Sequence, residues 1–534
     1  MNKTRSRWRL VVLGVLAFMT LAVTAACTVL VADEPRRPPP PGITEPVLLA
    51  LAVPFEHRWA RDSSHPLLAA AAIDIDGDGR DEVFLGGSAG QPDALLVWHE
   101  GALVDRAAAL QLGDTRATYG ALSLDLDGDG RVDLLTVGEA GLTLWLNRGA
   151  RFEPRAIEVK LPPDAVPLAV TAGDFDRDGR VDLYLSLFVA PAKFRSPVFN
   201  DPAHAKTNVL LRNLGELAFQ DVTDRVTAGL QNTFTSSFVD LDRDGWLDLV
   251  LAQNTGEAEI LHNRGQGRFE RLPLRTGYGF WMGLAFGDLH GKGHLDIFVS
   301  NAGSSIPGFV VRGDRRDDQP AALPWLLLRN DGGMRFTDIG EAAGLGGFGF
   351  AWGGSFEDIN LDGALDLLVA ENYVRWPIHR LFKLPGKVLL GGAGGAAGGP
   401  RFFTSEAGAN ASYGHVPLIA DLDGDGRNDL LWANMDGAAR AYLNRTPGRY
   451  LSVRLPDTPR SIGARVRLEG VPGAAVRYVI AGEGLTSDRT AQHTFGMPAG
   501  SAAPTALKVE WPDGRFTTIE NPLLHTRLVV AAPP

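Results

Sequence analysis

The chain has 534 residues, of which 45% are hydrophobic, and a formal net charge of −11 at pH 7. This length is too great for one compact core unless the chain forms a ring or a repeat array. The acidity does not suggest a nucleic-acid partner, and no basic patch interleaved with aromatics is present, so none is expected. The single cysteine, Cys27, excludes internal disulfides.

Residues 1–32 are predicted to be a signal peptide or membrane anchor. Three arginines precede the uncharged, mostly apolar stretch Leu10–Val31, which is the pattern of an export segment. The run Thr24–Cys27 resembles a bacterial lipobox, and the apolar stretch is also long enough for an uncleaved span. Small residues before Cys27 permit plain cleavage as well. We expect tethering to a membrane through lipidated Cys27 or an uncleaved helix, with the remaining chain outside the cytoplasm.

Residues 33–52 are rich in proline and are predicted to form an extended linker. The segment Phe55–Trp59 has the composition of an outer strand but precedes the first repeat described below. We therefore expect it to pair with the last repeat and to close a ring.

An aspartate-rich loop of the form D-x-D-x-D-G-x-x-D recurs between residues 53 and 448. The seven copies begin at Asp74, Asp125, Asp174, Asp240, Asp288, Asp358 and Asp421. Short apolar runs follow the loops, and turn signals such as Asn147-Arg-Gly149 recur between them, so each unit is predicted to be a set of antiparallel strands. Spacings of 48 to 70 residues suit a four-stranded propeller blade with insertions. The sequence predicts a seven-bladed β-propeller over residues 53–448.

The alternating carboxylates predict a calcium ion in each intact loop. A curled loop aims positions 1, 3 and 5 at one centre, and the glycine at position 6 permits the turn. The carbonyl of position 7 and the acid at position 9 then approach the 6–8 oxygens that Ca²⁺ prefers. The predicted ligands, about six sites in all, are Asp74, Asp76, Asp78, Arg80, Glu82, Asp125, Asp127, Asp129, Arg131, Asp133, Asp174, Asp176, Asp178, Arg180, Asp182, Asp240, Asp242, Asp244, Trp246, Asp248, Asp358, Asn360, Asp362, Ala364, Asp366, Asp421, Asp423, Asp425, Arg427 and Asp429.

Two alternatives to a propeller calcium loop exist. An EF-hand is disfavoured, because these loops lack a glutamate at position 12 and no helical pattern follows them. Aspartate and glycine are also common in turns that bind no metal. The fifth loop, Asp288 to Asp296, has His290 and Lys292 at positions 3 and 5. We expect that loop to be empty, with the Lys292 ammonium in place of the cation or with the loop acting only as a polar turn.

Residues 449–534 are predicted to form a small antiparallel β-sandwich or barrel, because short strands alternate apolar and polar residues, as in Ala464–Leu468. The aspartate loops resemble the FG-GAP/VCBS repeats of integrin α-chain propellers and of many bacterial exported proteins. The motifs Gly482–Ser487 and Val509–Gly514 resemble the ASPIC/UnbV domain, and the whole layout resembles the cartilage acidic protein family. The resemblance implies calcium-binding propeller loops and an extracytoplasmic setting, and it implies no catalytic activity.

The function expected from the sequence is a non-enzymatic, calcium-binding scaffold for extracytoplasmic binding or adhesion, with a protein or carbohydrate ligand that the sequence does not name. Aromatics around Trp281 and Trp352 could stack on a ligand or pack between blades. One alternative is a polysaccharide-acting lyase or hydrolase, although no H-E-x-x-H or G-x-S-x-G motif is present. An Arg–His–carboxylate cluster in the propeller channel would favour that alternative. Another is a structural partner in a cell-envelope complex.

Overall fold

The computed structural model describes residues 34–533 apart from 195–201, 227–231, 266, 273, 304–314, 373–383 and 394–398. The predicted export segment, residues 1–32 with Cys27, lies outside the described residues. The described chain consists of strands and single turns of 3-10 helix at Pro191–Lys193, Pro202–His204, Thr223–Arg225 and Pro459–Ser461. No helix among these residues is long or apolar enough to cross a membrane.

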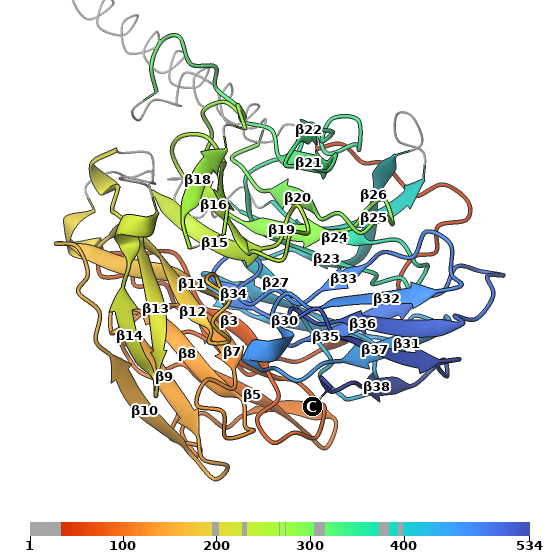
Figure 1. The fold of residues 1–534 in the computed structure, drawn as a ribbon, viewed down its shortest axis with the longest axis horizontal. Coiled ribbons are helices and arrows are strands. Elements are labelled where there is room, and N and C mark those ends of the chain that lie inside the picture. Colours follow the sequence, from red (N-terminus) through yellow and green to blue (C-terminus); the bar gives the residue numbers. More distant parts are fainter. Residues whose placement is uncertain are drawn as a thin grey trace, which may run out of the picture.

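Within the described residues, seven antiparallel sheets of similar design follow one another along the chain (Figure 1). The first contains β3 (Ala70–Ile73), β4 (Glu82–Leu85), β5 (Ala94–His99) and β6 (Ala102–Asp105), and the second β7 (Thr118–Leu124), β8 (Asp133–Gly138), β9 (Gly141–Asn147) and β10 (Phe152–Ile157). The third contains β11 (Ala165–Gly173), β12 (Asp182–Val189), β13 (Val209–Gly215) and β14 (Ala218–Asp221), and the fourth β15 (Thr233–Val239), β16 (Asp248–Gln253), β17 (Glu259–Asn263) and β18 (Phe269–Leu272).

The remaining sheets repeat this order. The fifth contains β19 (Leu284–Gly287), β20 (Asp296–Val299), β21 (Leu326–Asn330) and β22 (Phe336–Asp338), and the sixth β23 (Ala351–Glu357), β24 (Asp366–Glu371), β25 (Gly386–Ala393) and β26 (Pro400–Asn410). The seventh contains β27 (Gly414–Ala420), β28 (Asp429–Asn434), β30 (Arg440–Asn444) and β1 (Leu48–Leu51). Each aspartate loop joins the first and second strands of its sheet.

The sheets close into a ring. The first strand of each sheet contacts the first strand of the next, and β27 of the seventh sheet contacts β3 of the first. Apolar side chains from neighbouring sheets fill the space between them, as where Phe175 and Tyr184 pack against Phe238 and Leu249. The predicted all-β propeller followed by a small β domain is confirmed.

Ring closure involves the expected N-terminal segment and also a strand before it. The outer strand of the seventh sheet is β1, which pairs antiparallel with β30 and lies inside the predicted linker 33–52. The expected closing segment contributes only β2 (Glu56–His57), which pairs with β29 (Gly437–Ala438). The proline-rich part is also docked, since Glu34 accepts a hydrogen bond from the Gly349 amide at 3.0 Å. The outer edge of β30 carries backbone groups that would otherwise lack hydrogen-bonding partners, and the apolar strand Leu48–Leu51 pairs with them.

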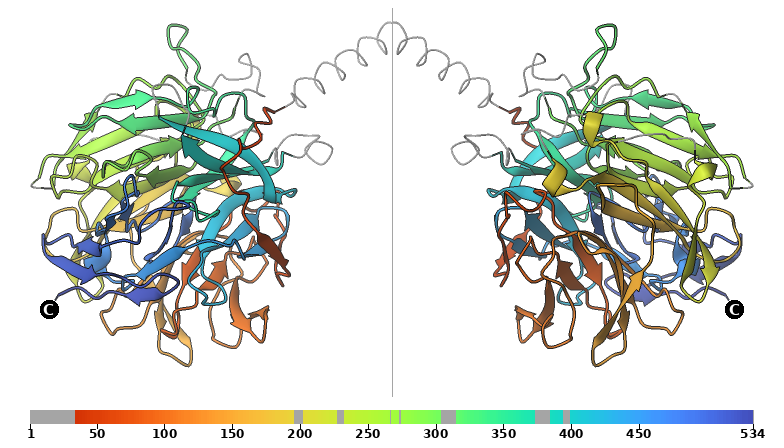
Figure 2. Two further views of the ribbon diagram at one scale, coloured as in Figure 1. Left: turned by 90° about the vertical axis from the view of Figure 1, so that its right-hand side faces the viewer. Right: turned by 90° about the vertical axis from the view of Figure 1, so that its left-hand side faces the viewer.

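The C-terminal domain packs two sheets around one core. One sheet contains β35 (Gln492–Gly496), β31 (Tyr450–Arg454) and β38 (Arg527–Val529), and the other β33 (Arg477–Tyr478), β32 (Arg465–Glu469), β36 (Ala506–Glu510) and β37 (Phe516–Glu520). Leu451, Val466, Leu507 and Trp511 are buried between them. Figure 2, where this domain is dark blue, shows it against one face of the ring.

Residues 481–489 of the C-terminal domain enter the centre of the ring, and we name this segment the plug. Its strand β34 (Ser487–Asp488) pairs in parallel with β3 of the first sheet. Other plug residues contact the innermost strands of the remaining sheets, as where Thr171 Oγ1 donates to the Ala481 carbonyl at 2.7 Å and Ser237 Oγ to the Gly482 carbonyl at 3.2 Å. The hollow beside the plug has a volume of only about 10 Å³. The propeller channel is therefore filled at this level by the chain itself.

Candidate metal-binding loops

All seven aspartate loops share one backbone conformation. In the second loop, Asp125 accepts hydrogen bonds from the amides of Gly128 and Gly130 at 2.8 and 3.0 Å. In the fifth loop, Asp288 accepts from the amides of Lys292 and Gly293 at 2.9 and 2.8 Å. The sixth residue of every loop is a glycine with φ between 73° and 92°, a conformation that a Cβ disfavours. The first aspartate thus closes the turn even where the other ligand positions have been replaced.

The acid at position 9 joins the loop to the third strand. Asp133 is fully buried, and its carboxylate accepts hydrogen bonds from the amides of Leu126 at 3.1 Å and Asn147 at 2.9 Å. The Asn147 side chain then donates to the carbonyl of Ile75, in the preceding loop, at 2.8 Å. The same contact between neighbouring blades recurs at Asn263 with Phe175, Asn330 with Leu241, and Asn444 with Ile359. The sequence marked this asparagine only as a turn residue.

Five loops gather three possible metal ligands whose atoms lie within 4.8 Å of one another, among the residues that the structure describes. Four of these clusters are made only of carboxylates: Asp74, Asp76 and Asp78; Asp125, Asp127 and Asp133; Asp174, Asp176 and Asp182; Asp421, Asp423 and Asp425. The fifth cluster combines Asp242 and Asp244 with His262. Of the predicted acidic ligands in these five loops, Glu82, Asp129, Asp178, Asp240, Asp248 and Asp429 lie outside the clusters.

Burial and the neighbouring carboxylates raise the pKa values of acids in these loops. Burial, together with the nearby Asp176 and Asp174 carboxylates, raises the pKa of Asp182 to about 8. Arg212 offsets part of this charge from outside, because its Nε donates to Asp176 Oδ2 at 2.6 Å. The other oxygen of Asp176, Oδ1, is buried without a hydrogen-bond partner. An oxygen-only set with an orphaned carboxylate oxygen fits a hard divalent cation such as Ca²⁺.

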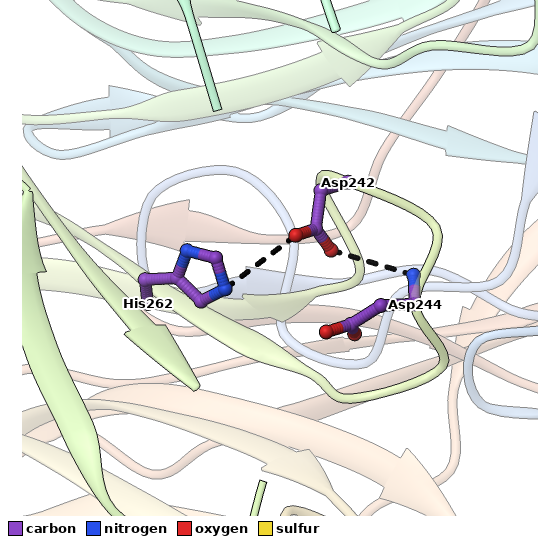
Figure 3. Close-up of side chains that lie close together, drawn as sticks. All are labelled: Asp242, Asp244 and His262. Atoms are coloured by element: carbon purple, nitrogen blue, oxygen red, sulfur yellow. Dashed lines mark hydrogen bonds and ion pairs between the residues drawn. The ribbon is translucent and has the colours of Figure 1, made fainter. Parts of the chain in front are cut away.

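The fourth loop has a different donor set (Figure 3). His262, from strand β17, is buried, and its Nε2 lies 3.4 Å from Asp242 Oδ2. It occupies the position that Arg212 has in the preceding repeat, directly before the asparagine of the third strand. Imidazole nitrogen suits Zn²⁺ and other transition metals better than Ca²⁺. The sequence analysis missed His262, and its position before Asn263 is the signal that could have found it.

The fifth and sixth loops gather no such cluster in the described part of the chain. In the fifth, the His290 ring contacts Asp296 with Nδ1 and Oδ2 2.8 Å apart, so the histidine, rather than the expected Lys292 ammonium, pairs with the loop carboxylate. In the sixth, Asn360 Nδ2 donates to Asp362 at 3.0 Å and also to the Thr44 carbonyl at 3.0 Å. The second bond orients the amide so that its NH₂ group faces the Asp362 carboxylate, while its oxygen accepts from the Asp362 backbone amide at 3.2 Å.

The C-terminal domain covers much of the loop face. Five loops contact it directly, through Arg454 with Asp74, the Asp125 amide with the Asp457 carbonyl, the Val476 amide with Asp288, the Gly496 amide with Asp358, and Gln492 with Asp421. Among the described residues no hydrogen bond joins the third or fourth loop to this domain. The acidic loops therefore form much of an internal interface, while the third and fourth loops border one open hollow and the fifth and sixth loops border another.

An Arg–His–carboxylate cluster does exist at the foot of the plug. Arg489 lies 3.3 Å from the Glu357 carboxylate and 3.2 Å from His493 Nδ1. Burial lowers the pKa of His493 well below its usual value, and the cations Arg489 and Arg477 lower it further. The hollow that Arg489 lines holds about one water molecule by volume. A polysaccharide cannot reach these groups in this conformation.

The aromatics that could have stacked on a ligand are interior. Tyr278, Trp281 and Trp352 are 2% exposed or less. Phe348 stacks on Trp325 with ring centroids 4.9 Å apart. These side chains pack within and between blades, which was the alternative to stacking on a ligand.

Comparisons with known proteins agree with this architecture. The FG-GAP-like repeat family matches residues 74–136, 125–185 and 240–299, and the ASPIC and UnbV family matches residues 456–533. The chain thus carries FG-GAP-like repeats and a C-terminal ASPIC/UnbV domain, as predicted. No curated protein sequence matches the chain.

Three solved structures show a distant similarity to this chain. One is an Agrocybe aegerita lectin that recognises non-reducing terminal N-acetylglucosamine, 17% identical over 71% of this chain and 91% of the lectin, with a TM-score of 0.36. The exotype rhamnogalacturonan lyase YesX is 14% identical over 78% of this chain and 75% of the lyase, with a TM-score of 0.38. The V. cholerae biofilm matrix protein Bap1 is 11% identical over 89% of this chain and 76% of that protein, with a TM-score of 0.31.

Proposed function

We propose that this chain is an exported, membrane-tethered scaffold whose propeller loops bind Ca²⁺ and which binds a ligand without catalysing a reaction. The observation that carries the proposal is the set of four carboxylate-only clusters, each with ligand atoms within 4.8 Å. Three carboxylates repel one another at that distance, and although arginines such as Arg148 and Arg212 offset part of the charge, a divalent cation relieves the remaining repulsion. The Asp174, Asp176 and Asp182 cluster is the strongest case, because Asp176 Oδ1 has no other partner.

In this proposal the residues at positions 1, 3 and either 5 or 9 hold the cation, and the glycine turn presents them. The ion would supply positive charge at the seam between the ring and the C-terminal domain. Since Arg454 and Gln492 already bind the first aspartates of the first and seventh loops, metal binding is expected to stabilise the docking of the two domains. A binding role fits the sealed Arg489–His493 cluster better than a polysaccharide-cleaving role does.

Isothermal titration calorimetry of the EDTA-treated and then chelator-free chain tests the calcium proposal. We expect about four Ca²⁺ per chain, one for each carboxylate-only cluster. Saturation should raise the melting temperature, because a ligand at 100 times its Kd stabilises by about 2.7 kcal/mol per independent site. Asp176→Asn should remove one site, whereas the exposed control Asp62→Asn should remove none.

Two results would contradict the proposal. A chain that shows no calorimetric heat and no change in melting temperature with millimolar CaCl₂ does not use these loops for calcium. Equal stoichiometry in Asp176→Asn and Asp62→Asn would show that any bound calcium lies elsewhere.

A further inference from the structure

A groove runs along the seam between the propeller and the C-terminal domain. It consists of three adjoining hollows of about 660, 260 and 820 Å³. The first two share Arg243 and Arg465, and the last two share Lys292 and Gly473. We name the whole the seam groove, and its floor is formed by the third to sixth aspartate loops.

The middle hollow is strongly cationic, although the chain as a whole is acidic. Five basic side chains and a single carboxylate, Glu510, line it. Arg465 pairs with Glu510, while Arg467 and Lys508 pair with Glu469 at 3.2 and 2.7 Å. Arg243 and Lys292 are exposed and make no ion pair with any described residue. Unbalanced cations in a hollow attract anions.

The neighbouring hollow adds two more such cations, Arg177 and Arg460. Both are exposed and line the groove beside the third and fourth loops. Arg177 lies over the Trp246 ring at 5.2 Å from its centroid, which holds the guanidinium in place without neutralising it. The groove thus carries four cations, Arg177, Arg243, Lys292 and Arg460, that form no ion pair within the described residues, beside the carboxylates Asp174, Asp240, Asp244 and Asp513 that line the same hollow.

Two of these cations lie on left-handed backbone in the aspartate loops. Arg177 and Arg243 occupy the fourth position of their loops with φ of 58° and 67°. The same position is glycine in four other loops, at Gly77, Gly128, Gly291 and Gly424. In the sixth loop the same position is Leu361, with φ of 60°, so non-glycine residues are tolerated there in three loops. Glycine adopts this conformation without the strain that a Cβ brings.

We propose that the seam groove binds an acidic polysaccharide, a linear chain bearing carboxylate or sulfate groups. Guanidinium groups form charge-assisted, bidentate hydrogen bonds with either anion. The groove also exposes one aromatic ring, Phe516, which is 58% exposed and offers a flat apolar surface to a sugar ring. Single-stranded nucleic acid is disfavoured, because its bases stack on several aromatics, and Phe516 is the only exposed aromatic among the described residues that line the groove.

The proposal names the ligand class of the scaffold proposed above and rests on that function only for its metal dependence. Asp174, Asp240 and Asp244 line the same groove. A cation held by these loops would add positive charge to the floor and contribute a further contact to a ligand carboxylate. The arginine contacts need no metal, so binding should persist in EDTA and strengthen in CaCl₂.

Calorimetric titration of the full chain with polygalacturonate, dextran sulfate, neutral dextran and single-stranded DNA tests the proposal. Each ligand is titrated in EDTA and in millimolar CaCl₂, and the first two separate carboxylate from sulfate recognition. The key variant is Arg177→Gly with Arg243→Gly, because glycine already occupies this position in other loops and should fold without strain. The matched control is Arg151→Gln, an exposed arginine on the second sheet away from the groove.

We expect at least one of the two polyanions to bind and neutral dextran to be silent. The double glycine variant should bind about 100-fold more weakly, at about tenfold per charge-assisted contact, while Arg151→Gln should match the unmodified chain. The proposal would be overturned if the unmodified chain bound neither polyanion. It would also be overturned if the double variant and the unmodified chain had equal Kd values. Tighter binding of DNA than of either polyanion would overturn it in favour of nucleic acid.

Comparison of the titrations in EDTA with those in CaCl₂ separates the two proposals. Arginine-dependent binding in EDTA with no effect of CaCl₂ would support the groove and contradict the calcium loops. Calcium binding without any polyanion binding would support the loops and contradict the groove.

Discussion

The inter-blade asparagine offers a quantitative test of how the ring holds together. Asn263 is fully buried, and its Nδ2 donates to the carbonyls of Phe175 at 2.9 Å and Leu247 at 3.2 Å, while Oδ1 accepts from the Gly265 amide at 3.1 Å. Asn213, its counterpart in the third sheet, makes the contacts within its own blade, to the Val181 carbonyl and from the Gly215 amide. The two residues therefore differ by the bond to the preceding blade.

Asn263→Ala is expected to lower the free energy of unfolding by about 3 kcal/mol and Asn213→Ala by about 2 kcal/mol, at about 1 kcal/mol for each lost hydrogen bond. The difference of about 1 kcal/mol measures the contact between blades. Urea unfolding in EDTA, followed by both tryptophan fluorescence and circular dichroism, gives these values where the two probes coincide. The reasoning is refuted if Asn263→Ala is no more destabilised than Asn213→Ala, since the bond to Phe175 would then contribute nothing.

Three further predictions concern the loops and the plug. In EDTA, the free energy of unfolding should fall between pH 6 and pH 8.5 (roughly the range around the shifted values), because burial raises the pKa of Asp182 and Asp248 to about 8. The native state holds these protons when the unfolded state has lost them, so their contribution to stability is lost as pH rises through about 8, and CaCl₂ should cancel the loss. His262→Gln should weaken Mn²⁺ or Zn²⁺ binding about tenfold or more while leaving the number of calcium sites unchanged, as measured by competitive titration. Asp488→Ala should lower the free energy of unfolding by about 2–4 kcal/mol, because the amides of Gly482 and Ser123 lose their buried acceptor, and limited proteolysis should then cleave the C-terminal domain sooner.

Each of these has a clear contrary result. Unfolding that is independent of pH between 6 and 8.5 (approximately the window set by the shifted carboxylates) would show that the loop carboxylates are already ionised in the native chain. Unchanged transition-metal affinity in His262→Gln would leave His262 as a simple hydrogen-bonding partner of Asp242. For the plug, Glu520→Ala is the matched control, since Glu520 is exposed on the same domain. Equal stability of the two alanine variants would mean that the plug does not depend on Asp488.

Local features of the fold could be predicted because they depend on neighbours in the chain. The aspartate–glycine spacing specifies a turn whose amides fold onto the first aspartate, as at Asp125 and Asp288, whether or not the side chains suit a metal. Recurrence of that turn between apolar runs then determined an all-β propeller, because each blade must bury both faces against its neighbours. The strand β1 escaped prediction because its sequence lies among prolines, and only the free edge of β30 explains why Leu48–Leu51 extends the seventh sheet.

The composition of the sites depended on distant parts of the chain. Sequence spacing placed Asp242 and Asp244 in one loop, but only folding brought His262 to them from the next hairpin. Likewise, nothing in the sequence around Ser487–Asp488 indicates that it pairs with Ala70–Ala71, far earlier in the chain. By itself, therefore, the sequence determined the repeat, the turn and the supply of carboxylates. The tertiary structure decided which carboxylates meet, which cations stay unbalanced, and that the channel is filled, because each of these depends on side chains that only the closed ring places together.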